Sequence, residues 1–260
     1  MTEIALPQAF IKFGKSKHMW KYIDEGELRF SIADEFRHMK NGNNKIADSH
    51  EGCLYYFAVN VCIAPMSSDN MDDIDHENVK EIEGEFPIRI TNPTIQHIPI
   101  HCLYCYNDSP MNALVKLENY DQLVSGLDDY DTAVIIYKPL EYIDKLKSKF
   151  QIYADHVEYV NTTPSETEVN DMIRYLYYKR KEFAEQKEFR ISLPTEQIEK
   201  PENYNFGSLL DVAYCVPLKA FKNGLIIAEN QDEFQRIKNS FENRGMKIKE
   251  ERMFYDVRKG

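Results

Sequence analysis

Short strand-like and helix-like segments follow one another along this chain in no regular order. Residues 9–13 alternate apolar and polar side chains, as a half-buried strand does, and residues 133–137 form a strong β run. Helical spacing is found at 16–23, where Ser16 is placed to cap the helix, and at 139–150. Regular alternation of strands and helices would indicate a parallel sheet. Its absence predicts an α+β fold with a mixed, mostly antiparallel β core and flanking helices.

The same patterns predict the remaining elements. Further strands are expected at 28–31, 53–63, 86–90, 95–106, 152–160, 188–193, 212–216 and 225–228. Further helices are expected at 119–127, 165–183 and 232–243, the second with a capping box of Ser165 and Glu168. Residues 66–78 are acidic and are expected to form an exposed loop. A length of 260 residues, with no internal repeat and no Gly/Pro-rich linker, favours a single domain over residues 1–260.

Composition places the chain among globular proteins. Hydrophobic residues make up 43% of it and aromatic residues 12%, which argues against disorder. The first residues carry Glu3 and Pro7 instead of the basic start and apolar run of a signal peptide. The longest apolar stretch is interrupted by Asn60 and Pro65, so no membrane span is expected. The sequence therefore predicts a soluble, cytoplasmic protein.

The cysteines and glycines exclude several kinds of site. Five scattered cysteines without a secretory context indicate reduced thiols. Cys102 and Cys105 are the only pair at metal spacing, and the second pair or histidine pair that structural zinc requires is missing, so no metal is expected. Only 10 glycines are present, and neither phosphate-binding glycine motif occurs. ATP-binding and Rossmann-type chemistry are therefore disfavoured.

The net charge of -11 argues against a general nucleic-acid coat, because duplex binding depends on clustered Lys and Arg. One short stretch nevertheless concentrates basic residues and suggests a local groove: Arg174, Lys179, Arg180, Lys181, Lys187 and Arg190. The alternative is a solvated charged face.

Arginine and carboxylate residues are dense near the N-terminus. Tyr22, Arg29 and Arg37 are followed by Asp48 and Glu51 on a polar loop. Arginine in such a loop can bind an anionic ligand while the acids hold it in place. The alternative is a salt bridge between Arg37 and Asp48 that only fixes the loop.

Two later positions could also carry chemistry. His101 and Tyr104 fall on different faces of a strand, and a lone strand histidine is more often simply hydrogen-bonded than catalytic. Gln186 and Glu188 lie where a loop enters a strand, and in an extended segment both would point to one side. A carboxylate there could stabilise an oxocarbenium-like sugar cation while the amide orients the attacking group. The alternative is an edge-strand Glu188 paired with Arg190 or Lys187.

In this order the motifs resemble a broad family of bacterial and phage proteins. They are Lys21-Tyr22, Leu28-Arg29-Phe30-Ser31, Phe36-Arg37, Asp48-Ser-His-Glu51-Gly52 and Glu185-Gln-Lys-Glu-Phe-Arg190. That family is similar to ADP-ribosyltransferase-like toxins of the DarT type, which act on nucleic acids. The resemblance implies an ADP-ribosyltransferase-like fold, with Glu188 as catalytic carboxylate and Gln186 as the amide that orients the substrate. It implies NAD contacts for Tyr22, Arg29 and Arg37, and for His101 or Tyr104 in mid-chain. The Ser-Thr-Ser motif of the arginine-modifying enzymes is absent.

The leading hypothesis is therefore an NAD-dependent ADP-ribosyltransferase, a toxin or phage-defence enzyme that modifies an RNA or DNA base. By analogy, a neutralising antitoxin protein is expected as partner. A protein acceptor and simple NAD hydrolysis remain open. The first alternative is a non-catalytic module that binds a nucleotide or peptide. A weaker one is a nuclease that uses Asp48, Glu51 and a metal.

Overall fold

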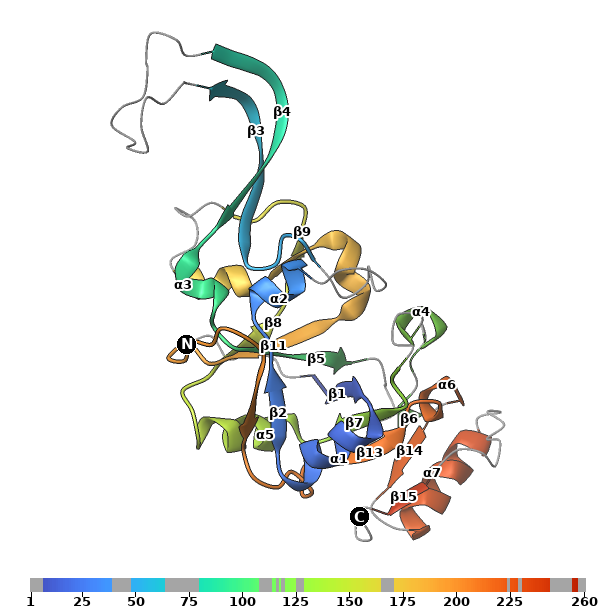
Figure 1. The fold of residues 1–260 in the computed structure, drawn as a ribbon. Coiled ribbons are helices and arrows are strands. Elements are labelled where there is room, and N and C mark those ends of the chain that lie inside the picture. The colour runs from blue at the N-terminus through green and yellow to red at the C-terminus, as the bar shows by residue number, and fades with distance from the viewer. Residues whose placement is uncertain are drawn as a thin grey trace.

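A six-stranded antiparallel sheet lies at the centre of the molecule in the computed structural model (Figure 1). The strand order is β13-β7-β1-β5-β11-β8, and every neighbouring pair is antiparallel. The strands are β1 Ala9–Gly14, β5 Ile100–Tyr106, β7 Thr132–Ile136, β8 Tyr153–His156, β11 Glu188–Ser192 and β13 Ala213–Pro217. The predicted α+β class with a mostly antiparallel core is therefore confirmed.

The structure describes part of the chain. The described residues are 7–38, 48–63, 80–107, 114–115, 117, 120–124, 129–164, 171–223, 225–228, 231–243 and 254–256. The predicted acidic loop at 66–78 lies outside them. Within them, no helix is both long enough and apolar enough to cross a membrane.

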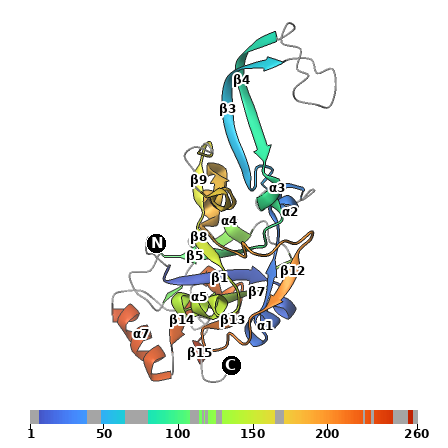
Figure 2. The ribbon, with the colours of Figure 1, turned by 90° about the vertical axis from the view of Figure 1, so that its left-hand side faces the viewer.

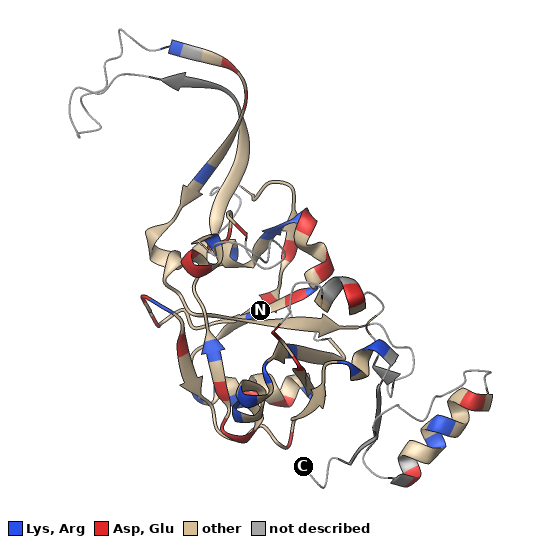
Figure 3. Ribbon diagram, turned by 45° about the vertical axis from the view of Figure 1, so that its right-hand side comes forward, with Lys and Arg blue, Asp and Glu red and all other residues tan. Residues whose placement is uncertain are grey.

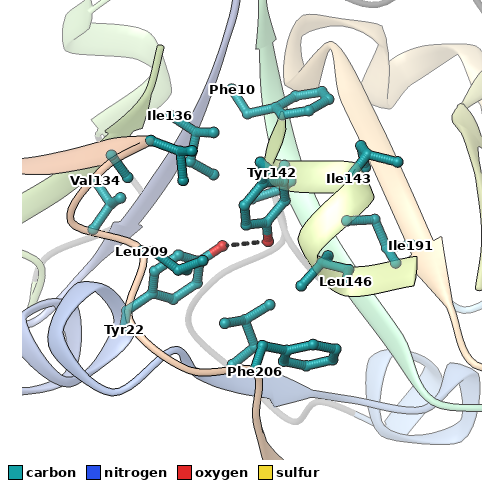
Figure 4. Close-up of a cluster of buried hydrophobic side chains, with 14 of the residues drawn as sticks. Phe10, Tyr22, Val134, Ile136, Tyr142, Ile143, Leu146, Ile191, Phe206 and Leu209 are labelled. Carbon is teal, nitrogen blue, oxygen red and sulfur yellow. Dashed lines mark hydrogen bonds between the residues drawn. The ribbon is translucent and has the colours of Figure 1, made fainter. Parts of the chain in front are cut away.

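Two helices pack on one face of the sheet, α1 (Ser16–Asp24) and α5 (Pro139–Lys147), and complete an apolar core (Figure 4). Each buries one stripe of its surface, formed by Met19, Tyr22 and Ile23 in α1 and by Tyr142, Ile143 and Leu146 in α5. Both stripes belong to the same cluster as Phe10 and Phe189 of the sheet, whose ring centroids are 4.6 Å apart.

The start of α1 differs from the prediction. Lys15 occupies the N-cap position without a side-chain cap, and the Ser16 backbone N–H donates to Asp131 Oδ1 at 2.7 Å. Pairing of β1 with β7 brings this carboxylate to the helix start, so Ser16 is not the cap. After α1 the chain turns at Gly26, which has φ +64°, and a Cβ there would lie 2.0 Å from the Gly207 carbonyl oxygen.

The helix predicted at 165–183 does not form in its described part. Residues 165–170, with the proposed capping box, lie outside the described residues, and 172–186 form two 3₁₀ helices on either side of a short strand. These are η3 (Met172–Tyr177), β10 (Tyr178–Arg180) and η4 (Lys181–Gln186). The consecutive residues from Tyr175 to Tyr178 are all buried, and a helix with one covered face cannot bury four successive side chains. β10 instead pairs in parallel with β9 (Glu158–Val160).

Smaller elements surround the sheet. β2 (Glu27–Phe30) pairs with β12 (Glu202–Asn205), and β14 (Leu225–Ala228) pairs with β6 (Leu114–Val115) and β15 (Phe254–Asp256). The remaining helices are α2 Ala33–His38, α3 Pro93–Gln96, α4 Tyr120–Val124, α6 Ala220–Asn223 and α7 Gln231–Asn243. The strand predicted at 95–106 begins only at Ile100, because Pro93 starts α3 and the Asn92 side chain caps it.

A long hairpin projects from the rest of the molecule (Figures 1 and 2). Its strands are β3 (Cys53–Ile63) and β4 (Lys80–Thr91), paired from Cys53 with Thr91 to Ile63 with Lys80. The strand predicted at 53–63 is confirmed, while the one predicted at 86–90 is only the part of β4 nearest the body.

Candidate functional site

Glu188 is the first residue of β11, next to β5 in the sheet and directly opposite Tyr104. Gln186 ends η4, and Lys187 between them adopts a left-handed conformation with φ 41°. The prediction of one extended segment with both side chains on one side is therefore wrong. Lys179 brings them together instead, because its Nζ donates to Gln186 Oε1 at 2.7 Å and to Glu188 Oε2 at 3.1 Å.

Arg190 holds Glu188 from the same strand, two residues further on. Arg190 Nε donates to Glu188 Oε1 at 2.8 Å, and Nη2 donates to Oε2 at 3.3 Å. Its Nη1 contacts Glu51 Oε1 and the Leu176 carbonyl oxygen. The pairing of Glu188 with Arg190 matches the alternative drawn from the sequence, but β11 is not an edge strand, since β5 and β8 flank it.

These contacts define a buried charge cluster of Glu51, Lys179, Glu188 and Arg190. Arg190 and Glu51 are 0% exposed and Glu188 is 7% exposed. Lys179 Nζ also lies 3.6 Å from Glu51 Oε2. Two carboxylates and two cations make the cluster neutral as a whole, which offsets part of the cost of taking four charges out of water.

The charges keep Glu188 ionised. Burial alone would raise the pKa of Glu188, but Arg190 and Lys179 outweigh burial and hold that pKa well below its ordinary value. Burial likewise lowers the pKa of Lys179, yet Glu188 and Glu51 raise it more, so the ammonium stays charged. Burial and the Glu188 charge raise the pKa of the neighbouring Cys102 thiol, which is therefore not a reactive thiolate. The cluster therefore presents Glu188 as an anionic carboxylate near pH 7.

Tyr22 and His101 lie on the other face of the sheet. His101 is opposite Ile191 in the β5–β11 register, three positions from the Tyr104–Glu188 pair, and side chains three apart on a strand point to opposite faces. Burial holds the pKa of His101 well below its ordinary value, so the ring is neutral.

The neutral ring fixes the direction of a hydrogen-bond chain. His101 Nδ1 lies 2.9 Å from the Arg29 carbonyl oxygen, which can only accept, so Nδ1 carries the proton. Nε2 then accepts from the Tyr22 hydroxyl at 3.0 Å, and that hydroxyl accepts from Tyr142 at 2.7 Å (Figure 4). His101 is thus a fully hydrogen-bonded core histidine.

The two arginines of the N-terminal motif are separated. Arg29 is exposed and pairs with Glu35 at 2.8 Å. The Arg37 side chain is only 5% exposed, and its guanidinium donates to the Glu51 carbonyl oxygen at 2.7 Å and to Asp34 at 3.0 Å. The predicted salt bridge to Asp48 is therefore wrong, because Asp34 lies one helical turn from Arg37 on α2 and takes its place. Asp48 accepts instead from Arg180 Nε at 3.0 Å.

Most of the predicted basic groove is neutralised by acids. Arg174 contacts Asp155 and Glu158, Arg180 contacts Asp48 and Glu182, and Lys179 and Arg190 belong to the buried charge cluster. Figure 3 shows basic and acidic segments interleaved over the body of the molecule. These four residues therefore offer no free positive surface to a phosphate backbone.

The described part of the chain holds no group of three or more His, Cys, Asp or Glu residues arranged to bind a metal. Cys102 and Cys105 are three positions apart on β5 and point to opposite faces of the sheet, so they cannot chelate one ion. Asp48 and Glu51, the acids of the nuclease hypothesis, contact Arg180 and Arg190.

Comparison of the chain with protein-family models, curated proteins and solved structures finds no match. The site must therefore be judged from its own geometry. That geometry brings Glu188, Gln186 and Tyr104 together, links Arg37 to them through Glu51, and leaves Tyr22, His101 and Arg29 elsewhere. Sequence patterns missed Lys179 as a partner of Glu188 and Glu51 as a partner of Arg190. Glu51 could not be found locally, since 139 positions separate it from Arg190.

Proposed function

We propose that this chain is an NAD-dependent ADP-ribosyltransferase with an ADP-ribosyltransferase-like fold, and that Glu188 is its catalytic carboxylate. The observation that carries the proposal is the ionised Glu188 at the head of a central strand, linked to Gln186 by one lysine. A carboxylate held as an anion can stabilise an oxocarbenium-like sugar cation. The antiparallel core is compatible with this fold.

The chemistry asked of Glu188 is electrostatic. When the bond between the nicotinamide nitrogen and ribose C1′ breaks, its electron pair stays on nicotinamide, which leaves as a neutral base. Positive charge develops on the ribose, and the anionic Glu188 stabilises it. The acceptor then forms a bond to C1′ and loses its proton to solvent. Because its pKa is far below neutral, Glu188 is a poor proton acceptor and serves as a charge.

The geometry also sets a requirement for access. Glu188 is 7% exposed, so NAD can reach it only if a neighbour moves aside. Lys179 is the candidate, because it joins Glu188 to the half-buried Gln186 at the end of η4. In the proposal, Lys179 leaves Glu188 when NAD binds and Arg190 stays.

The proposal names no acceptor. Four of the six basic residues that favoured a nucleobase acceptor are paired with acids, so they no longer favour one. The residues kept for the NAD site are Glu188, Gln186 and Tyr104. Tyr22, Arg29 and His101 are left out of it because they lie away from Glu188, and an antitoxin partner stays a prediction.

The second candidate is a non-catalytic binding module in which the buried charge cluster only stabilises the fold. Full pairing of Glu188 with Arg190 and Lys179 favours it. The two candidates differ in what Glu188→Gln removes: catalysis and stability in the first, stability alone in the second.

The test uses NAD labelled in its adenylate part, with mixed protein, DNA and RNA acceptors, and follows both nicotinamide release and label transfer. Glu51→Gln is the matched control, because it removes the other carboxylate of the same cluster. The proposal predicts turnover by the wild type, at least about a hundredfold loss in Glu188→Gln, and retention in a folded Glu51→Gln. No nicotinamide release from folded wild type would favour the binding module. Equal loss of turnover in both folded variants would show that activity depends on the cluster as a whole and would overturn the assignment of Glu188 as the catalytic carboxylate.

A further inference from the structure

The chain enters β11 through a left-handed residue. Lys187 has φ 41°, and it is the only described residue other than glycine with a positive φ. Two backbone hydrogen bonds hold it there: its N–H donates to the Ala184 carbonyl oxygen at 3.1 Å, and its carbonyl oxygen accepts from the Cys105 N–H at 2.7 Å. A lysine disfavours this conformation, so the fold has to impose it. An imposed backbone conformation next to a proposed catalytic residue indicates that the geometry of the turn matters to function.

The strand itself begins with an irregular hydrogen bond. In the pairing of β8 with β11, the position next to the Phe189–His156 pair would join Glu188 to Val157 through two backbone hydrogen bonds. The Val157 N–H does donate to the Glu188 carbonyl oxygen at 2.9 Å. The Glu188 N–H, however, donates to the Tyr159 hydroxyl at 2.8 Å. A side chain has therefore taken the place of a backbone acceptor at the residue whose carboxylate is proposed to act.

Tyr159 comes from the same small sheet as Lys179. The two residues are partners in the parallel pairing of β9 with β10, so their side chains project from one face of that sheet. Both reach Glu188: Lys179 Nζ contacts the carboxylate at 3.1 Å, and Tyr159 holds the backbone N–H. Lys179 is the side chain that leaves Glu188 in the proposed function. Tyr159 then keeps this sheet joined to Glu188.

The Tyr159 hydroxyl stays protonated. Burial raises the pKa of Tyr159, and the neighbouring Glu188 charge raises it further. A phenol in this state does not exchange a proton near pH 7, so Tyr159 has no acid–base step in the reaction. What it supplies is a hydrogen-bond acceptor at a fixed place beside Glu188.

We propose that Tyr159 is a positioning residue. Its hydroxyl locks the left-handed turn at Lys187 and thereby keeps the Glu188 carboxylate in place while Lys179 moves aside. Without that acceptor the Glu188 N–H loses its partner and the turn relaxes, which shifts the carboxylate relative to the sugar cation that it stabilises. This role rests on the proposed function, because it belongs to the same reaction.

Tyr159→Phe tests the role, because it removes the acceptor and keeps the ring. Nicotinamide release by the full chain, followed over a range of NAD concentrations, gives kcat and KM. We expect kcat to fall by about tenfold or more while KM changes by less than about twofold. The pH profile should keep its shape, because the lost hydroxyl does not titrate near neutral pH.

Tyr175→Phe is the matched control. The Tyr175 hydroxyl also bonds a backbone group, the Pro164 carbonyl oxygen at 3.1 Å, but it lies outside the buried charge cluster. Removing it makes the same chemical change without freeing Glu188. Its kcat should therefore stay within about twofold of the wild-type value.

The outcomes separate this role from the proposed function. No nicotinamide release from folded wild type overturns both. Turnover by the wild type with an unchanged kcat in folded Tyr159→Phe, or with an equal fall in Tyr175→Phe, overturns the role of Tyr159 alone. A rise in KM at unchanged kcat also overturns it, since Tyr159 would then contact the substrate directly.

Two variants of Lys187 test the turn with the Tyr159 hydroxyl intact. Both replace the same exposed lysine, but asparagine adopts the left-handed conformation readily and β-branched valine does not. We expect kcat of Lys187→Asn to exceed that of Lys187→Val by about fivefold or more. Equal kcat values in the two folded variants would show that the turn does not position Glu188. That result would overturn the proposal even if Tyr159→Phe does not fold.

Discussion

The two faces of the strand pair β5 and β11 bury polar groups in different ways. On one face, Glu188 and Arg190 belong to a cluster of four charges. On the other face, His101 lies one register position from the Arg190–Cys102 pair. It belongs to a chain of neutral groups that starts at Tyr142. Both arrangements are buried, and nearly every group in them has a partner.

The two faces differ in the group that is left without a partner when one residue of the cluster or of the chain is removed. Loss of a partner from the charged side leaves a buried charge without compensation, which costs several kcal/mol. Loss of a partner from the neutral side leaves a hydroxyl or ring nitrogen that costs about 1–3 kcal/mol at most. Mutations on the charged face should therefore cost more stability than mutations on the neutral face. The charged face is also the one on which the proposed chemistry takes place.

Arg190→Met is expected to have the largest effect. It leaves Glu51 and Glu188 with Lys179 as their only cation, so the free energy of unfolding should fall by roughly 3–5 kcal/mol. Arg190→Lys is the control, since it keeps the charge but loses the fork that reaches both carboxylates, and should cost less. Urea denaturation of the three proteins measures this. Equal losses in both variants would show that geometry matters more than charge.

A double-mutant cycle tests whether the four charges of the cluster depend on one another. Adding Glu51→Gln to Arg190→Met leaves Glu188 and Lys179 as one neutral pair. The double variant should therefore lose less stability than the sum of the single variants, with a coupling energy of about 1–3 kcal/mol. Glu35→Gln in the same Arg190→Met background is the control, because Glu35 pairs with Arg29 and not with the cluster. A purely additive result would contradict the cluster as a unit.

The sequence predicted the frame of this site but not its partners. Alternation of apolar side chains located β11 and β5, and the spacing of Glu188 and Arg190 by two positions on a strand was a readable sign of contact. Nothing local to Arg190 indicates Glu51, because the fold brings these two residues together over 139 positions. Tertiary burial also overrode the helical pattern near Tyr177. Its neighbours are buried on all sides, and periodicity alone cannot distinguish that case from an amphipathic helix.

As the pH falls, the protein should first lose stability through His101 on the neutral face, and only at lower pH through Glu188 on the charged face. Burial and Lys12 lower the pKa of His101 in the folded protein, so the unfolded chain binds a proton there first as the pH falls below about 6.5. Stability is therefore complete above that pH and is lost below it, by up to about 1.4 kcal/mol per pH unit for one proton. Glu188, with its lowered pKa, adds a loss in the same direction only below about pH 4.5.

His101→Gln isolates the first of these two windows, because glutamine keeps hydrogen-bonding capacity and does not titrate. Unfolding free energies measured from pH 7.5 to 5 should fall less steeply in the variant than in the wild type. His50, whose pKa burial and Arg180 also lower, is present in both proteins and contributes equally to both curves. Parallel curves would mean that His101 takes up its proton in the folded protein as readily as in the unfolded chain. Nε2 would then donate to the Tyr22 hydroxyl, while Nδ1 would still donate to the Arg29 carbonyl oxygen.

Tyr142→Phe is expected to give the smallest effect on the buried network. It removes the donor to the Tyr22 hydroxyl and leaves the bond from Tyr22 to His101 intact, so about 1 kcal/mol of stability should be lost. Tyr137→Phe is the matched control, because its hydroxyl donates to the Asp211 carbonyl oxygen at an exposed site, where water can replace it. In thermal and urea unfolding, Tyr137→Phe should lose less stability than Tyr142→Phe, and both should lose far less than Arg190→Met. A loss from Tyr142→Phe as large as that from Arg190→Met would mean that the two faces do not differ in kind, because a neutral chain would then respond to truncation as strongly as a cluster of charges.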